Sequence, residues 1–461
     1  MVTTSQYPEF KIGRSSRPVL GWIALRIASV LFVAAAVSIP ATALALPSFA
    51  RQTSLPCAAC HTNLPQLNSF GREFKLNGYL LSSGQSKFPH VSFMAQFGFT
   101  HTNEGQQPPP AAGFDPNDNF SLNQASVFYG GRVIPGYVGG FVQGTYDGVE
   151  HAWAWDNLDI RFAHTSSIGD KDLAYGVTLN NNPTVSDLWN STPAWTFPYS
   201  TSGLAPAPAA APLIQGGLAQ QVLGVGAYGM WNDTVYLEAA GYQSLSANTL
   251  DSLGADPGGA EVKGLAPYWR IAGQHSWGDN YLEFGTFGLY AETYPDRDKS
   301  QGTDRTADVG VDAQYQYSRD ENGYSLLTSF ISEKNIWNAS KALGFTSNSD
   351  DRLYSFYVTP SYLYDKTYGL TVSYFSIWGD SDVNLYGTNT GSPDSNGFIF
   401  QLDWLPLNKG GGPSFMPYSN AKISLQYTLY NKFDGSSSNV DGTGRNASDN
   451  NTLYLQLWIA F

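Results

Sequence analysis

The chain has 461 residues, including 47 glycines and 28 tyrosines, and only 14% of its residues are charged. A formal net charge of −13 argues against binding to nucleic acid, because phosphates attract basic surfaces. A composition rich in Tyr and Gly, with two cysteines in all, is typical of an exported β-sheet protein and leaves no cysteine for a disulfide framework.

Residues 1–45 have the features of a secretory signal peptide. Basic residues precede the short apolar stretch 28–39, and residues 43–45 (Ala-Leu-Ala) form a cleavage site of small residues. The alternative, a membrane anchor, needs about 20 apolar residues, which is more than this stretch contains. The sequence therefore predicts export from the cytoplasm.

The next segment, residues 46–90, contains the sequence CAACH at residues 57–61. Two cysteines separated by two residues and followed by histidine have the spacing at which c-type haem is attached. Zinc would need further ligands at metal spacing, and a redox dithiol would need a βαβ pattern nearby; the sequence shows neither, and a local disulfide is the third alternative. We expect one covalent haem c bound by Cys57 and Cys60, with His61 as the proximal iron ligand.

Residues 46–90 are too few to bury a stable core by themselves. Several prolines interrupt the segment, so we expect only short helices, around residues 57–61 and 67–75, with turns between them. A covalent haem would supply part of the missing core, and another part of the protein must supply the rest.

From residue 91 to residue 461, apolar side chains alternate with small or polar ones, which is the pattern of half-buried strands. We predict sixteen strands in this part of the chain. Their ranges are 91–100, 119–130, 138–146, 153–164, 173–180, 221–231, 233–242, 267–277, 280–290, 305–317, 323–331, 353–364, 366–375, 396–405, 420–430 and 451–461.

The connections between these strands are alternately long and short, as in outer-membrane barrels with tight periplasmic turns and long outer loops. One exception is the glycine-rich connection 406–419, which is long where a short turn is expected. A soluble β-sandwich would also alternate, but the apolar last strand, 451–461, would then be an exposed edge prone to aggregation. We predict an all-β fold: an antiparallel outer-membrane β-barrel of about sixteen strands over residues 91–461, with a small N-terminal haem c domain plugging its lumen.

The long connection 181–220 is aromatic, which is unusual for a loop in water. It contains Trp189, Trp195 and Tyr199. We interpret it as folded into the lumen, against the barrel wall or the haem segment; the alternative is a compact surface loop.

Three residues are candidates for the sixth ligand of the haem iron. Met94 lies on the polar face of the first predicted strand and would point into the lumen, where its thioether would raise the reduction potential. His90, just before that strand, would lower the potential, and Lys75 is the third candidate. We predict Met94 as the distal ligand; the alternative is that Met94 serves as lumen packing.

Acidic residues gather in the presumed outer loops. Their summed field could draw cations to the mouth, but charges of this kind usually only solvate a loop surface, and we assign no iron site to them. They are Asp296, Asp298, Asp304, Asp350, Asp351, Asp380, Asp382, Asp434, Asp441 and Asp449.

The segment around the CAACH motif resembles the fused monohaem cytochrome–porins of iron-oxidising bacteria. The resemblance is carried by residues 47–53 (PSFARQT), the motif at 57–61 and the pattern FGREFKLNGY at 70–79, with a second match at 180–199. It implies an outer-membrane porin plugged by a small haem domain that takes electrons from ferrous iron outside the cell. Periplasmic cytochromes or other electron carriers would then receive these electrons.

The predicted activity is therefore one-electron transfer rather than bond-making catalysis, and the expected partners are ferrous iron, a periplasmic carrier and outer-membrane lipid. Two alternatives stay open. One is a passive porin in which haem only stabilises the plug. The other is a haem conduit or redox enzyme for a different donor, which would need a distal acid–base residue that the sequence does not reveal.

Overall fold

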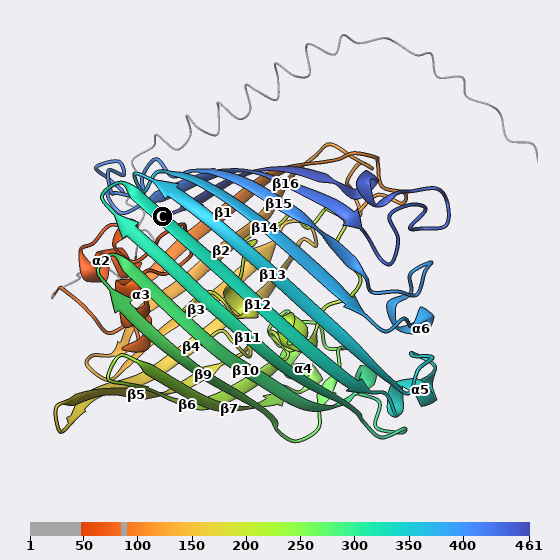
Figure 1. Cartoon of the computed structure of the whole chain (residues 1–461), viewed down its shortest axis with the longest axis horizontal. Helices are drawn as coiled ribbons and strands as arrows, with labels where there is room; N and C mark the ends of the chain where they lie inside the picture. Colours follow the sequence, from red (N-terminus) through yellow and green to blue (C-terminus); the bar gives the residue numbers. More distant parts are fainter. Residues whose placement is uncertain (1–47, 84–89) are drawn as a thin grey trace, which may run out of the picture. The chain divides into compact units, whose positions relative to one another are not determined.

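The computed structural model of the protein describes residues 48–83 and 90–461. The predicted signal peptide, residues 1–45, lies outside these residues and stays a prediction. The described chain forms a closed antiparallel β-barrel (Figure 1). Within the described residues, sixteen strands form the ring, and a two-residue strand, β8, pairs with β10 beside it. The predicted all-β fold and the number of strands in the ring are confirmed.

Each of the sixteen predicted strands corresponds to one strand of the ring. The strands are β1 (Val91–Thr102), β2 (Asn119–Ile134), β3 (Val138–Asp147), β4 (Ala152–Ile168), β5 (Lys171–Asn180), β6 (Val222–Trp231), β7 (Val235–Ser244), β8 (Glu261–Val262), β9 (Ala266–Trp277), β10 (Asn280–Tyr294), β11 (Asp304–Arg319), β12 (Asn322–Ile336), β13 (Asp350–Tyr364), β14 (Tyr368–Gly379), β15 (Ser395–Trp404), β16 (Asn420–Lys432) and β17 (Thr452–Ala460).

The ring is closed by pairing of the first strand with the last. In the β1–β17 register, Met94 lies opposite Ala460 and Thr102 lies opposite Thr452. β17 is also paired with β16, so its apolar residues are not on a free edge. The ring strands range from 9 residues in β17 to 17 in β4, whereas a tilted strand needs only about 9–11 residues to cross a bilayer.

The two faces of the strands differ in polarity as the alternation predicts. On β11, Val309 and Val311 are exposed on the outside, whereas Asp308, Asp312 and Gln314 are buried on the inside. Such a pattern suits a barrel with lipid outside and polar packing inside.

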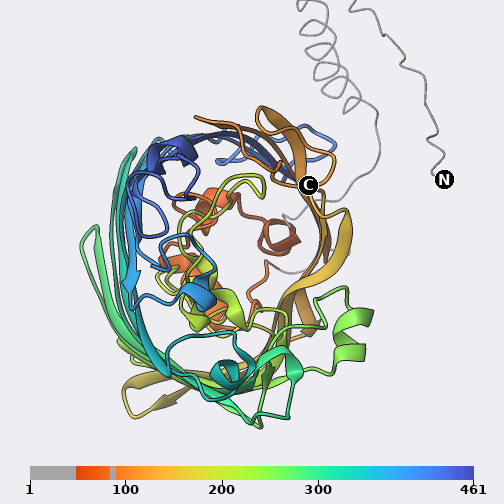
Figure 2. The ribbon, with the colours of Figure 1, turned by 90° about the vertical axis from the view of Figure 1, so that its right-hand side faces the viewer.

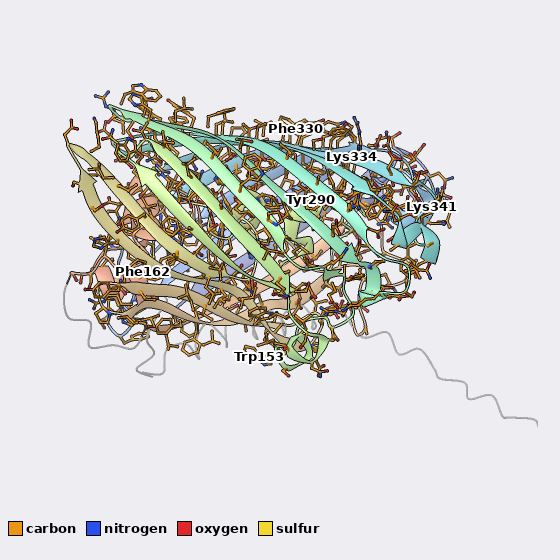
Figure 3. All side chains as sticks on the ribbon, turned by 90° about the horizontal axis from the view of Figure 1, so that it is seen from below. Trp153, Phe162, Tyr290, Phe330, Lys334 and Lys341 are labelled. Atoms are coloured by element: carbon orange, nitrogen blue, oxygen red, sulfur yellow. The ribbon has the colours of Figure 1, made fainter. Side chains whose placement is uncertain are left out.

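An apolar belt covers the outer surface of the ring. Its members include aromatic residues such as Trp153, Phe162 and Tyr290, which are exposed and labelled in Figure 3. In water this surface would be an aggregation hazard, whereas a closed ring leaves no backbone group unpaired in hydrocarbon. The protein is an outer-membrane β-barrel.

The connections at the two ends of the barrel differ in length. Tight turns such as 232–234, 278–279 and 320–321 lie at the end where β1 begins. Longer loops lie at the other end and contain the short helices α4 (Ala247–Ser252), η4 (Pro295–Arg297), α5 (Ala339–Leu343), α6 (Val383–Tyr386) and η5 (Ala447–Asn450). The alternation of long and short is not strict. The β3–β4 connection, 148–151, is short at the long-loop end, and 405–419 is long at the short-turn end.

Residues 48–83, the described part of the N-terminal segment, lie inside the ring of strands (Figure 2). They contain α2 (Ser48–Thr53), η1 (Cys57–Ala59) and α3 (Ser69–Leu76), of which the last two were predicted as short helices. Arg72 of α3 donates hydrogen bonds to Gln314 and Gln316 of the wall at 2.9 and 2.8 Å. Leu76 packs against wall residues and against Trp189. The barrel therefore supplies the core that this segment lacks.

No helix in the described part of the chain is long and apolar enough to cross a membrane.

The connection between β5 and β6 also enters the lumen, as predicted, and it contains η2 (Pro193–Trp195) and η3 (Leu213–Gly217). Trp189 is fully buried, and its indole N–H donates to the hydroxyl of Tyr281 on the wall at 2.5 Å. Further along, the backbone N–H of Ile214 donates to the carboxylate of Asp308 at 2.8 Å. The alternative of a surface loop is excluded.

A buried ionic cluster joins this inserted connection to the wall. Arg270 of β9 contacts Asp187 at 3.1 Å, Glu283 at 3.1 Å and Asp312 at 2.8 Å, and all four side chains are fully buried. One guanidinium therefore partly compensates three carboxyl groups, so the cluster depends on this arginine.

We predict that Arg270→Met destabilises the barrel by about 3–5 kcal/mol, because it leaves buried carboxylates without their cation. Unfolding in urea, followed by the shift of the folded band in gel electrophoresis, measures the change. The matched control is Arg305→Met, whose side chain is half exposed and 3.5 Å from Glu292 at the rim. An exposed pair contributes about 0–1 kcal/mol, and equal losses in the two variants would contradict this account of the cluster.

Candidate functional site

The CAACH motif forms a tight turn inside the lumen. The backbone N–H groups of Cys60 and His61 both donate to the carbonyl of Cys57, at 3.1 and 3.0 Å. A turn of this kind brings side chains four residues apart to the same side, and both Cys57 and His61 line one cavity. Cys60 is not among the residues that line it. The N–H of Ala58 donates to the carbonyl of Asn408 at 3.0 Å, which anchors the turn to the connection 405–419.

The N-terminal end of α3 is hydrogen-bonded to the CAACH motif and supports it. The N–H of Asn68 donates to the carbonyl of Cys60 at 2.9 Å, and its side chain caps α3 by accepting from the N–H of Gly71 at 3.0 Å. A Cβ atom at Gly71 would lie 2.2 Å from the carbonyl oxygen of Cys60. Only glycine permits this approach of the helix to the CAACH turn.

One ring nitrogen of His61 is already hydrogen-bonded to the backbone. Its Nδ1 lies 2.9 Å from the carbonyl oxygen of Pro65, and a carbonyl can only accept, so Nδ1 carries the proton. The other nitrogen, Nε2, is then the unprotonated one, as iron ligation requires. Burial lowers the pKa of His61, although the carbonyls of Pro65 and Gln66 oppose this, and a lowered pKa favours the neutral ring.

The cavity beside His61 has a volume of about 550 Å³, within the range of roughly 300–1,000 Å³ that holds organic ligands and cofactors. Its wall is mostly aromatic and apolar, with amide and charged side chains interspersed. Residues from the N-terminal segment, the inserted connection and the barrel all contribute, among them Phe49, Leu64, Met94, Phe128, Phe141, Trp195, Tyr199, Lys422 and Trp458.

The residues that line this cavity, together with Cys60 of the adjacent turn, fit a covalent haem. Both cysteines are free thiols, and burial raises the pKa of Cys57 and raises that of Cys60 to about 12. The unprotonated nitrogen of His61 is available to iron, and the apolar wall suits a porphyrin face. Cys57 and Cys60 would hold the macrocycle and His61 its iron.

Two of the three candidate distal ligands line the cavity. Met94 is buried on the inner face of β1, as predicted, and the Gln96 side chain donates to its sulfur at 3.7 Å. His90 lies instead against Tyr129, with ring centroids 5.9 Å apart, and is not among the cavity residues. Met94 is therefore better placed than His90 to reach a bound group.

Lys75 also lines the cavity, but its ammonium group is already engaged. Its Nζ donates to the carbonyls of Val185 and Asp187 at 2.7 and 2.6 Å and lies 4.9 Å from the ring of Trp195. Burial, together with the nearby Arg161, lowers the pKa of Lys75 to about 7. These contacts tie α3 to the inserted connection, which is a structural role.

Asp156 is a cavity residue that sequence reasoning missed. A β-bulge places Asp156 and Asn157 of β4 opposite one position of β3, so both side chains reach the cavity. Period-two alternation assigns such neighbours to opposite faces, and no local sequence signal marks the bulge. The Asp156 carboxylate accepts from Thr145 at 2.8 Å and Asn157 at 3.0 Å.

Several acidic residues of the outer loops are buried rather than solvated. Asp304 accepts from the N–H groups of Ala339 and Ser340, and Asp382 accepts from four backbone N–H groups. Burial opposes ionisation of Asp382, but these hydrogen bonds prevail and lower its pKa. The view of these loop acids as solvated is wrong for Asp304, Asp351 and Asp382, which are almost fully buried. Among the described residues, no group of three or more His, Cys, Asp and Glu could hold a metal ion.

No protein-family model matches the sequence, and no curated protein matches it. Among solved structures, the chain is similar to the outer membrane channel DcaP of Acinetobacter baumannii, with 12% identity, a TM-score of 0.47, and coverage of 83% of this chain and 100% of that one. It is similar to an anion-selective porin from Comamonas acidovorans, with 11% identity, a TM-score of 0.45, and coverage of 80% and 98%. It is also similar to OmpT, an outer membrane protein of Vibrio cholerae, with 10% identity, a TM-score of 0.40, and coverage of 80% and 97%.

We predict that Gly71→Ala disrupts haem attachment, because its methyl group would displace the carbonyl of Cys60 and with it the CAACH turn. Covalent haem is measured by peroxidase staining of denaturing gels, normalised to folded barrel. Gly105→Ala is the matched control, since the nearest atom to its Cβ would be 3.4 Å away. Normal haem content in Gly71→Ala would show that the turn does not require this contact.

Met94→Leu keeps an apolar side chain of similar size but removes the sulfur. If Met94 ligates the iron, the variant loses the near-infrared band of a methionine–iron bond and its reduction potential falls. Met230→Leu is the control, because Met230 is equally buried but packs in a separate cluster with Tyr228 and Tyr236. An unchanged spectrum in Met94→Leu would remove Met94 as the distal ligand.

Proposed function

We propose that this outer-membrane β-barrel is an electron-transfer protein that takes electrons from extracellular ferrous iron onto a single haem c and passes them to a periplasmic carrier. One observation carries the proposal. The haem-attachment turn at residues 57–61 packs inside the lumen, with Cys57 and His61 on the wall of a cavity of about 550 Å³.

The cavity is bounded by elements that enter the lumen from both ends. The N-terminal segment leads into β1 at the short-turn end, which is the periplasmic end in barrels of this class. The inserted connection enters from the long-loop end and brings Trp195 and Tyr199 to the same cavity. A redox centre held here lies between the outer and periplasmic sides, which supports a conduit across the membrane.

Haem c, when bound, supplies a centre that takes one electron from Fe²⁺, leaving Fe³⁺, and later gives that electron to the periplasmic carrier. The protein residues hold and shield this centre. Hydrogen bonding to Pro65 fixes the orientation of His61, and the aromatic and apolar side chains of the wall would lower the polarity around the redox centre. No proton transfer by the protein is needed in this scheme.

One observation favours a second candidate, a haem redox enzyme acting on a different small substrate. Such an enzyme needs an acid–base group near the iron, and Asp156 supplies a carboxylate at the cavity wall. The two functions differ in the state of the sixth position. A conduit ligated by Met94 gives a low-spin spectrum, whereas an enzyme with an open position gives a high-spin spectrum and binds small ligands such as cyanide.

We predict that Fe²⁺ rapidly reduces the haem of the detergent-solubilised protein in a stopped-flow spectrometer. Cys57→Ala and His61→Ala should abolish this reduction, because they remove attachment and proximal ligation. His101→Ala is the matched control, since His101 is an exposed residue that contacts Asp118 outside the cavity.

A haem that dithionite reduces but Fe²⁺ leaves oxidised at every pH tested would reject ferrous iron as the donor. Large solute conductance in planar bilayers, together with that result, would favour the passive porin instead.

A further inference from the structure

The cavity wall contains a buried cation without a counter-ion in contact. Lys422 is on the inner face of β16 and is only 2% exposed. Among the described residues its Nζ has one hydrogen bond, a long one of 3.3 Å to the carbonyl of Leu64. No carboxylate of the described residues lies within ion-pair distance of it. Burial of a charge is costly unless the charge is paired and hydrogen-bonded.

Asp403, on the neighbouring strand β15, forms no ion pair with Lys422 among the described residues. The carboxylate oxygens of Asp403 are instead occupied by Asn63 at 2.8 Å, Ser424 at 2.6 Å and Gln401 at 2.9 Å. The ammonium group therefore keeps most of its hydrogen-bonding capacity, since a lysine has three donors.

A donor without an acceptor lies directly opposite Lys422. In the β16–β17 register Lys422 pairs with Trp458, and Nζ lies 4.8 Å from the centre of the indole ring. The indole N–H of Trp458 is buried and has no acceptor within the described chain. Both residues line the cavity that also contains Cys57 and His61.

Lys75, the other lysine that lines the cavity, has an ammonium group that is engaged by hydrogen-bond acceptors. Its Nζ has two carbonyl acceptors at 2.7 and 2.6 Å and an aromatic ring beside it. Lys422 has an aromatic ring but lacks comparable acceptors. The difference indicates that an anion belonging to the occupant of the cavity completes the surroundings of Lys422.

We infer that Lys422 and Trp458 form a carboxylate-binding subsite that receives a propionate group of the haem. This rests on the proposed function, because haem c is taken as the occupant of the cavity. A carboxylate can accept a charge-assisted hydrogen bond from Nζ and a neutral one from the indole N–H. The subsite orients the porphyrin in addition to its attachment at Cys57 and Cys60.

The test uses the full chain with Cys57→Ala and Cys60→Ala, so that added porphyrin binds without a covalent bond. Fluorescence titration compares metal-free protoporphyrin, which has two propionates, with its dimethyl ester, which has none. Lys422→Met should weaken binding of the diacid by at least about tenfold, the effect of losing a charge-assisted hydrogen bond, and should leave the ester unaffected. Lys422→Arg should keep the preference for the diacid.

Two further variants complete this test, one as a control and one as a second substitution in the subsite. Lys409→Met is the control, because Lys409 is an exposed lysine paired with Asp365 outside the cavity. Trp458→Phe keeps a ring but removes the N–H, and it should weaken binding of the diacid less than Lys422→Met does. If Lys422→Met fails to migrate as a folded barrel, Trp458→Phe tests the subsite in its place. Equal binding of diacid and ester by the parent chain, or equal loss of both in Lys422→Met, would overturn the inference.

The holoprotein supplies an independent readout. A cation beside the porphyrin favours the reduced haem, which carries one more electron. Lys422→Met should therefore lower the midpoint potential, whereas Lys422→Arg should retain it. Porphyrin binding involves no electron transfer, so a persistent diacid preference alongside a failure of Fe²⁺ to reduce the haem would reject only the proposed donor. Loss of the preference with normal reduction by Fe²⁺ would reject only the subsite.

Discussion

The structure depends on one constraint: within lipid, every backbone N–H and C=O group must find its partner inside the protein. Pairing of β1 with β17 meets this constraint by closing the ring. Closure around sixteen strands also creates a lumen too wide to be filled by wall side chains alone. Two segments of the chain occupy that space, and each brings polar backbone and charged side chains that must be satisfied in turn.

Inside the lumen, different parts of the chain satisfy one another's polar and apolar groups. The N-terminal segment is too short to hold a core of its own, and its helix α3 packs against the wall and the inserted connection. The inserted connection lacks regular strands, and its carbonyls are taken up by Lys75 of α3 and by Arg161 of the wall. Each of the three parts thus supplies hydrogen-bond partners that another part needs, which is why the CAACH turn has a defined place in the lumen.

The candidate site follows the same rule of satisfaction, with one departure. Around the cavity, Lys75 and His61 each have carbonyl acceptors, and Asp156 has several donors. Lys422 and Trp458 have no comparable partners within the described chain. Because both side chains line the cavity, we infer that this pair is complementary to a ligand rather than to the protein.

Much of the fold and part of the candidate site could be predicted from the sequence, because the relevant signals are local. Alternation of period two gave the strands and the inward position of Met94, since successive side chains of a strand point to opposite faces. The spacing of Cys57, Cys60 and His61 predicts haem attachment, because side chains at this spacing could bind one edge and the central iron of one small group. What the sequence did not contain is the set of non-local contacts. Only the tertiary structure brought Asp156 to the cavity through a bulge, kept His90 away from it and paired Lys422 with Trp458 on its wall. These outcomes depend on strand register, which pairs Lys422 with Trp458, and on closure of the ring, which pairs β1 with β17.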